Sequence, residues 1–183
     1  MAAFGHLSPC VGRDKELNEM VRIIEGGRQN VMIVGDHGVG KMSMIEGIAE
    51  RMVQGDVPDR LYDKRLVELS PSQLLAGTTI SGAQERLIHI VREIKRADNI
   101  ILFINNIHEL MGVTDEQGKG MDVAQTLAEY VSDGRLFLFA TTTTEGYNQH
   151  ILNSELGTVF TQVIIKEMDE AGAIEVLESK AGA

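Results

Sequence analysis

Apolar residues recur along the chain in two periods, which predict helices and strands respectively. Spacings of three or four residues from Asp14 onward predict an amphipathic helix that ends at Gly26. The same spacing predicts helices after residue 41, over roughly 82–97, around 123–131 and over 169–180. Short apolar runs bounded by turn-forming residues predict buried strands at 31–34, 66–69, 100–104, 136–140 and 162–165.

The order of these elements predicts the fold class. Strands that alternate with helices imply parallel crossover connections. Strands that are apolar on both faces imply a sheet covered on both sides. We therefore expect an α/β protein, a three-layer α/β/α sandwich around a parallel five-stranded sheet. The sequence contains no internal repeat and no low-complexity linker.

Composition narrows the class of protein. The chain has 183 residues, 43% of them apolar, which suffices for the core of one domain. Its 17 basic and 27 acidic residues give a net charge of -10, which disfavours bulk electrostatic binding of nucleic acid. The single cysteine, Cys10, excludes an internal disulfide and favours a reducing compartment, either the cytoplasm or an organelle matrix or stroma. Neither a signal peptide nor a membrane span is expected.

One segment carries the pattern of a phosphate-binding loop, G-x-x-x-x-G-K followed by Ser or Thr. It is Gly35-Asp36-His37-Gly38-Val39-Gly40-Lys41-Met42. Glycines let successive backbone N–H groups turn toward a phosphate, and the N-terminus of the next helix adds further donors. The other interpretation is a glycine-rich turn with a solvated lysine. The predicted strand before the loop and helix after it favour phosphate binding.

The last position of this pattern is altered. A hydroxyl is expected there as a ligand for Mg²⁺, but Met42 offers a thioether, a poor ligand for a hard cation. Ser43 does not simply replace it, because consecutive helical side chains point about 100° apart.

A second departure follows the strand predicted at 100–104. Phosphate-loop enzymes that hydrolyse ATP place an Asp and a Glu there, to organise Mg²⁺ and to polarise the attacking water. This chain has Asn105 and Asn106, which are neutral amides. Either they are altered site residues, which we favour, or they only begin a loop.

Two further polar segments could belong to a site. His108 and Glu109 resemble a metalloprotease motif, but Gly112 stands where its second histidine would be. Thr141–Thr144 follow an apolar run, and either contact a γ-phosphate or form a strand-end turn.

Several motifs in order identify a resemblance. The family's DPVIGRD, VEGLA, GDVP, ILFIDELHTL, AMD and GATT motifs correspond to residues 8–14, 45–49, 55–58, 101–110, 120–122 and 140–142. On these residues, the chain resembles the first ATPase module of the Clp-type AAA+ unfoldases and disaggregases. The resemblance runs from about residue 8 to 178 and implies the large subdomain of a P-loop NTPase.

The resemblance implies roles for individual residues. Cys10 and Val11 would contact adenine, and residues 35–42 would hold the phosphates. Thr142 would act as the polar sensor. Ile80 falls in the family's pore-loop segment, although the family's aromatic residue is missing there. The implied division is an adenine-side segment at 1–13, a nucleotide-binding domain at 14–167 and, at 168–183, a C-terminal helix that would begin a lid subdomain the chain lacks.

The departures set the functional expectation. Leu156–Phe160 replace the family's LERRF and contain no arginine finger. We therefore assign no catalytic or metal-ligating residue. We expect ATP or ADP binding, weak or absent Mg²⁺ dependence, little hydrolysis and a structural or regulatory chaperone-type role. Partners would be rings of Clp-type proteins or further copies of the chain. The alternatives are a slow ATPase of a protein-unfolding machine and a nucleotide-free scaffold.

Overall fold

A computed structural model describes residues 13–27, 30–111, 123–134 and 136–167. Several predictions concern residues outside these ranges. They are the adenine contacts of Cys10 and Val11, the motif at 120–122 and the helix at 169–180.

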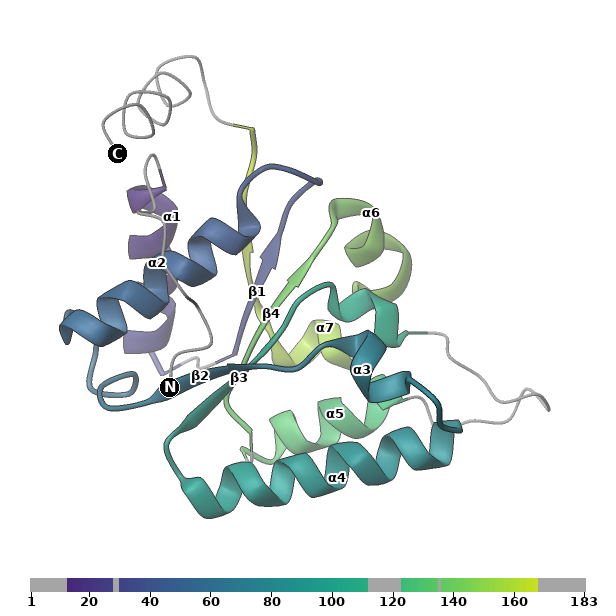
Figure 1. The fold of residues 1–183 in the computed structure, drawn as a ribbon. Helices are drawn as coiled ribbons and strands as arrows, with labels where there is room; N and C mark the ends of the chain where they lie inside the picture. Colours follow the sequence, from purple (N-terminus) through teal and green to yellow (C-terminus); the bar gives the residue numbers. More distant parts are fainter. Residues whose placement is uncertain (1–12, 28–29, 112–122, 135, 168–183) are drawn as a thin grey trace.

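The centre of the protein is a parallel sheet of five strands (Figure 1). The strands are β1 (Val31–Val34), β2 (Arg65–Glu68), β3 (Ile100–Ile104), β4 (Leu138–Thr142) and β5 (Thr161–Ile164). They lie in the order β2-β3-β4-β1-β5, and each pairs in parallel with its neighbours. Their carboxyl ends therefore meet at one edge of the sheet, the edge where open α/β sheets bind ligands.

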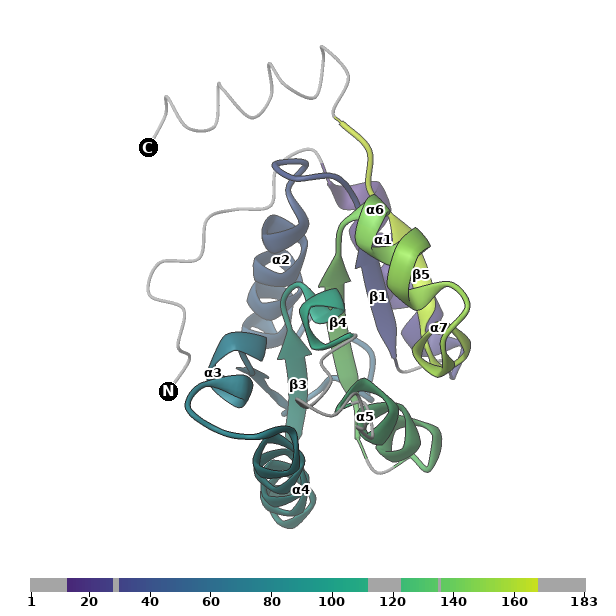
Figure 2. The same cartoon turned by 90° about the vertical axis from the view of Figure 1, so that its right-hand side faces the viewer.

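Helices cover both faces of this sheet, which confirms the predicted three-layer sandwich (Figures 1 and 2). One layer holds α1 (Asp14–Glu25) and α2 (Lys41–Gln54), and the other holds α4 (Ile80–Ala97), α5 (Val123–Ser132) and α7 (Glu155–Val159). The short elements are α3 (Pro71–Leu75), η1 (Ile107–Leu110), α6 (Thr144–Gly146) and the π-helical η2 (Tyr147–Ile151). In the described ranges, no helix combines the length and apolarity needed to cross a membrane.

Alternating side chains of the strands fill two separate cores. In β1, Val31 and Ile33 pack toward α1 and α2, whereas Met32 and Val34 pack toward α4 and α5. All four side chains are almost completely buried. Burial of such a side chain stabilises the fold by about 1.5–3 kcal/mol, so these two cores hold the sheet in place.

Some predicted boundaries are wrong by one or two residues. β4 was expected at 136–140 but runs through Thr142, because Thr141 and Thr142 pair with Ile33 and Val34 of β1. The strands predicted at 66–69 and 162–165 each begin and end one residue earlier. The turn interpretation of the threonines therefore fails for the first two.

The start of α4 also differs from the prediction. The helix begins at Ile80 because the Thr79 hydroxyl accepts a hydrogen bond from the Gly82 N–H at 3.1 Å and caps the first turn. Ile80 thus lies in a helical turn, not in a loop as the pore-loop comparison implied.

Candidate phosphate-binding site

The connection between β1 and α2 has the backbone of a phosphate-binding loop. Gly38 and Gly40 have φ angles of 78° and 98°, in the left-handed region where glycine carries no steric penalty. Gly40 also caps α2. The loop therefore joins the carboxyl end of a central strand to the N-terminus of a helix, where unpaired N–H groups attract anions.

Gly35 anchors the beginning of this loop. A Cβ atom at this position would lie 2.8 Å from the Ile165 carbonyl oxygen and 2.8 Å from Cγ2 of Val39, so only glycine fits. The Gly35 N–H donates to the Thr142 carbonyl at 3.2 Å. The loop is thereby held against β4 and against the residue that follows β5.

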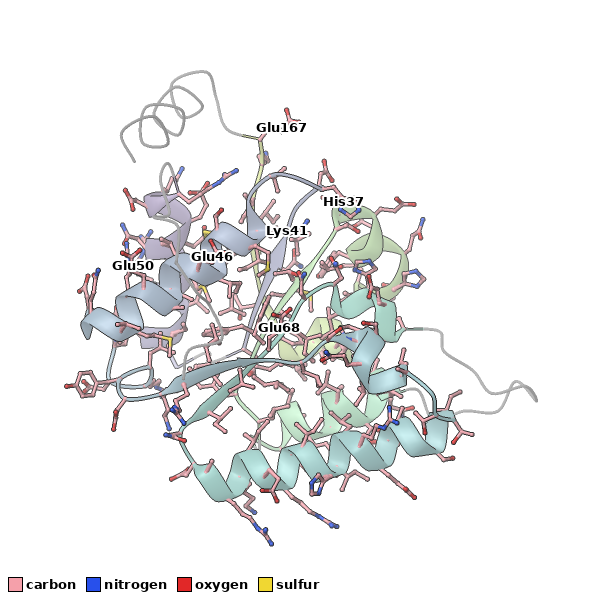
Figure 3. All side chains as sticks on the ribbon, in the orientation of Figure 1. His37, Lys41, Glu46, Glu50, Glu68 and Glu167 are labelled. Atoms are coloured by element: carbon pink, nitrogen blue, oxygen red, sulfur yellow. The ribbon has the colours of Figure 1, made fainter. Side chains whose placement is uncertain are left out.

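Lys41 is the first residue of α2 and is only 9% exposed. Its ammonium donates to the carbonyl oxygens of Gly35 at 2.6 Å and Asp36 at 3.0 Å, so the side chain folds back across the base of the loop. Figure 3 shows Lys41 at the start of α2, on the same edge of the molecule as His37 of the loop. Burial lowers the pKa of Lys41, and the nearby Asp36 opposes this. A bound phosphate would likewise favour the charged ammonium.

The side chain of Met42 packs against the core and offers no suitable ligand to a metal ion. Its side chain is half-buried and packs against the apolar core formed with α1 and α2. A thioether in this position serves packing, and its sulfur is too soft to suit Mg²⁺. Across the described ranges, no group of three or more His, Cys, Asp or Glu side chains is arranged to hold a metal ion. Neither Met42 nor the neutral Asn105 offers a magnesium ion the charged or hydroxyl oxygen that it prefers.

Asn105 and Asn106 follow β3 and share one buried threonine. The Thr141 hydroxyl donates to Asn105 Oδ1 at 2.5 Å and accepts from the Asn106 N–H at 3.0 Å. Thr141 itself is completely buried. Asn106 is left-handed at φ 54°, a conformation that Asn tolerates better than most residues. Thr141 thus holds the side-chain amide of Asn105 and the backbone of Asn106, and neither residue carries a charge.

His108 also lies at this candidate site, although its sequence pattern predicts no role there. Its Nδ1 lies 2.9 Å from Thr142 Oγ1, and its ring packs so closely against Gly146 that a Cβ there would lie 2.7 Å from Cγ of the imidazole. No local sequence signal marks it, because its contact with Thr142 joins residues that lie 34 positions apart in the sequence.

The pKa of His108 is lowered, first by burial. Glu109 raises it, whereas the nearby His150, His37 and Lys41 lower it further. The neutral imidazole is therefore favoured beside the loop.

The structure brings together most of the predicted site. Thr142 joins its two halves, since its carbonyl binds the loop at Gly35 and its hydroxyl binds His108 after β3. Ile80 lies in α4, in the helix layer on the opposite face of the sheet from α2.

Comparisons with known proteins place this geometry in context. Residues 31–169 match the family described as ATPase family associated with various cellular activities (AAA). The chain is 38% identical over 180 residues to the ClpA homolog of Cyanidium caldarium, an ATP-dependent Clp protease ATP-binding subunit, which covers 97% of this chain and 21% of that protein. It is 36% identical over 177 residues to the chaperone protein ClpB of Lactiplantibacillus plantarum, which covers 94% and 20% respectively. The chain thus spans about a fifth of the length of these relatives.

Solved structures give the same result. The S. cerevisiae Hsp104-ADP complex superposes with a TM-score of 0.82 and 29% sequence identity, covering 96% of this chain and 30% of that one. The sequence and structural matches confirm the resemblance to the first ATPase module of the Clp type and the P-loop NTPase fold.

Proposed function

The chain belongs to the AAA family of ATPases, and from that premise we propose that it binds ATP or ADP at residues 35–42 without turning the nucleotide over. In this proposal the domain is a structural or regulatory subunit of the chaperone type. Its relatives' names support the chaperone class but describe much longer proteins.

Support for binding comes from the backbone. A phosphate-binding loop holds its ligand mainly through N–H groups and a helix N-terminus, and these do not depend on the residues that have changed. Gly38 and Gly40 have the required left-handed backbone, and Lys41 stands at the base of the loop.

Support for loss of hydrolysis comes from one observation at the end of β3. Asn105 and Asn106 have neutral amide side chains, and Oδ1 of Asn105 accepts a hydrogen bond from the Thr141 hydroxyl. An amide cannot take a proton from water, and loss of a general base typically costs about 10²–10⁴ in rate. An absent arginine finger costs about 10³–10⁵ in related systems, although such losses do not simply add.

The proposed nucleotide complex depends little on magnesium. Met42 packs into the core where the family has a hydroxyl, and Asn105 supplies no charge to a metal-bound water. Lys41 and backbone N–H groups would therefore carry most of the phosphate charge.

The proposed partners are rings of Clp-type subunits, or further copies of this chain. The proposed location is the cytoplasm or another reducing compartment, supported by the lone Cys10. Binding of ATP or ADP would then alter how the domain packs in a ring, although the domain itself would not hydrolyse the nucleotide.

Calorimetric titration tests the proposal. ATP and ADP should each bind with similar affinity in the presence of Mg²⁺ or of a chelator, while steady-state phosphate release stays at background, with or without a Clp-type ring. Failure to bind either nucleotide would favour the scaffold interpretation. Sustained phosphate release would favour the slow ATPase.

Restoring the altered positions sharpens the test. A variant with Met42→Thr and Asn105→Asp should gain Mg²⁺-dependent binding, because it regains a hydroxyl ligand and a carboxylate. Adding Asn106→Glu introduces the missing base, but at a left-handed position that Glu tolerates less well than Asn. The two variants should therefore be compared, with unchanged Mg²⁺ dependence in both as the contradictory result.

A further inference from the structure

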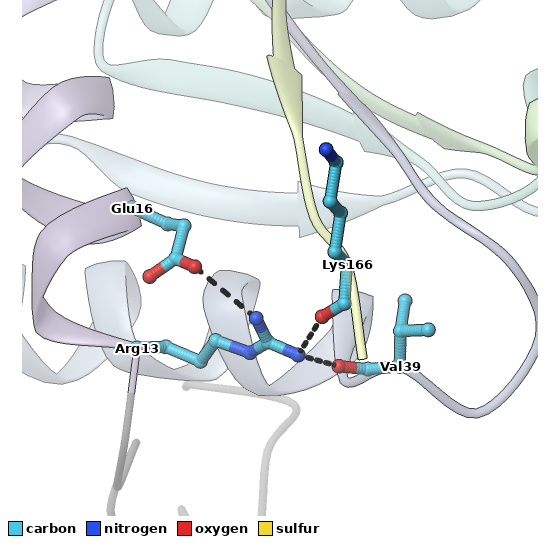
Figure 4. A network of polar contacts seen from close by, with 4 residues as sticks. All are labelled: Arg13, Glu16, Val39 and Lys166. Atoms are coloured by element: carbon cyan, nitrogen blue, oxygen red, sulfur yellow. Dashed lines mark hydrogen bonds and ion pairs between the residues drawn. The ribbon is translucent and has the colours of Figure 1, made fainter. Parts of the chain in front are cut away.

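A buried arginine lies behind the phosphate-binding loop, on the side away from the β3 and β4 residues described above. Arg13 precedes α1 and is only 3% exposed. Figure 4 shows its guanidinium between Glu16 of α1, the backbone of Val39 in the loop and the backbone of Lys166 after β5. A charge buried to this extent is costly unless it is paired and hydrogen-bonded.

The guanidinium joins three parts of the chain. Its Nη2 donates to the carbonyl oxygens of Val39 and, at 2.7 Å, of Lys166. Its Nη1 forms an ion pair with Glu16 Oε1 at 3.1 Å. The two carbonyls come from segments far apart in the sequence, so Arg13 fastens the loop to the end of β5.

The bond to Val39 has a consequence for the loop because a peptide unit is planar and trans. The Val39 carbonyl and the Gly40 N–H belong to the same peptide unit and point in opposite directions. A donor that holds the carbonyl toward Arg13 therefore turns the Gly40 N–H away from Arg13. Gly40 lies at the N-terminus of α2, where a phosphate would accept this hydrogen bond.

A further observation places the guanidinium against the loop. Arg13 Nε is buried without a hydrogen-bond partner, and a Cβ built on Gly40 would lie 3.8 Å from it. The side chain therefore packs directly behind the peptide whose orientation it controls. A planar guanidinium can hold two carbonyls and a carboxylate at fixed angles, whereas a lysine ammonium on a flexible stem cannot.

We propose that Arg13 is a positioning residue of the phosphate site, which holds the Val39–Gly40 peptide so that the Gly40 N–H faces the bound polyphosphate. This inference rests on the proposed function, because it assigns to Arg13 the orientation of a donor in the same loop.

The test compares Arg13→Gln and Arg13→Lys with Arg96→Gln, a charge-matched control at an exposed arginine on α4. Inorganic pyrophosphate and ADP are titrated at a temperature where every variant is folded by circular dichroism. Both Arg13 variants should bind both ligands about tenfold or more weakly, as expected for loss of a charged hydrogen bond. Arg96→Gln should bind like the wild type.

Pyrophosphate separates positioning from other roles because it has no adenine. An equal loss for pyrophosphate and ADP supports the inference, and a loss confined to ADP overturns it. The ¹H–¹⁵N resonance of Gly40 gives a local readout, since its shift on adding pyrophosphate should be large in the wild type and reduced in Arg13→Gln. A full Gly40 shift in the variant also overturns the inference.

A ligand-free measurement keeps the two proposals apart. Should the wild type fail to bind pyrophosphate and ADP, the proposed function fails. The role of Arg13 is then tested on the ligand-free protein. The chemical shift and the hydrogen-exchange rate of the Gly40 N–H should differ between the wild type and Arg13→Gln. Identical values would show that Arg13 does not orient this peptide. Arg13→Lys gives the same readouts if Arg13→Gln does not fold.

Discussion

The candidate site has two halves that are built from different chemical groups. One half is the loop at residues 35–41, and the other is the β3–β4 edge at Asn105, Asn106 and Thr141. The loop presents mainly backbone groups, and its requirements are glycine at a few positions and one lysine. The β3–β4 edge acts through side chains, so a change of residue type there changes the chemistry directly. A site can therefore retain its binding half while its hydrolytic half is lost.

At the β3–β4 edge, a hydrogen bond is present where a negative charge is absent. An amide at Asn105 accepts the hydrogen bond from Thr141 much as a carboxylate would, so the strand end keeps its position. The negative charge that would organise Mg²⁺ is absent. An Asn at this position can thus make the hydrogen bond that an Asp would make, although it brings no negative charge.

The largest expected effect is on the loop side. Lys41→Met should weaken binding of ADP about 100-fold, because truncating one partner of a buried charge contact costs several kcal/mol. The free energy of unfolding should change by no more than about 1 kcal/mol, since the lost hydrogen bonds are offset by removing a buried charge. Calorimetry and urea unfolding measure the two quantities.

Lys64→Met is the matched control, because Lys64 also donates to a backbone carbonyl, that of Asp98, but in an exposed hydrogen bond beside β2. Equal ADP affinity in the Lys41 and Lys64 variants would contradict the assignment of Lys41 to the phosphate site.

Gly35→Ala should produce the next largest effect. The new methyl would meet the Ile165 carbonyl at 2.8 Å, and overpacking against backbone of this kind should cost about 2.5 kcal/mol. Gly77→Ala is the control, since its site is open and only its φ of 64° opposes a side chain, at about 1 kcal/mol. Denaturant unfolding should rank the two in this order, and the reverse order would refute the close packing of Gly35.

On the β3–β4 edge, Thr141→Val should lower the free energy of unfolding by about 2 kcal/mol, because it leaves the Asn106 N–H and Asn105 Oδ1 without their partner. Thr144→Val, at an exposed threonine, should stay within about 0.5 kcal/mol of the wild type. An unchanged free energy of unfolding in Thr141→Val would mean that the hydroxyl does not hold Asn105 Oδ1 and the Asn106 N–H.

The smallest expected effect is a pH dependence from His108. Because burial lowers the pKa of folded His108, the unfolded chain binds its proton more readily. Stability is then complete above the ordinary histidine pKa of about 6.5 and falls as the pH drops through the lower folded value. The free energy of unfolding should therefore fall less between about pH 8 and acidic pH in His108→Gln than in the wild type, as measured by denaturant unfolding at each pH. Parallel curves for the two proteins would argue against a buried, neutral His108.

The sequence predicted what depends on local pattern. The loop at 35–42 was recognised because its glycines, its lysine and the flanking elements lie within one short stretch. The layers followed from apolar strands alternating with helices. The sequence also marked Asn105 and Asn106 as neutral replacements before their contacts were known.

Tertiary contacts account for what the sequence did not predict. Arg13 meets Val39 and Lys166 only after folding, and no local pattern records those pairings. His108 became a site residue through Thr142 and Gly146 on another strand connection. The end of β4 was placed too early because threonines resemble turn residues, whereas Thr141 and Thr142 satisfy their hydroxyls inside the protein.

The most direct test of the central claim follows the fate of bound ATP. Protein in excess over radiolabelled ATP is incubated with Mg²⁺ or with a chelator, separated from free nucleotide, and the bound nucleotide is identified by chromatography. The account predicts ATP retained intact under both conditions, and lost in Lys41→Met. Bound nucleotide converted to ADP only when Mg²⁺ is present would contradict it.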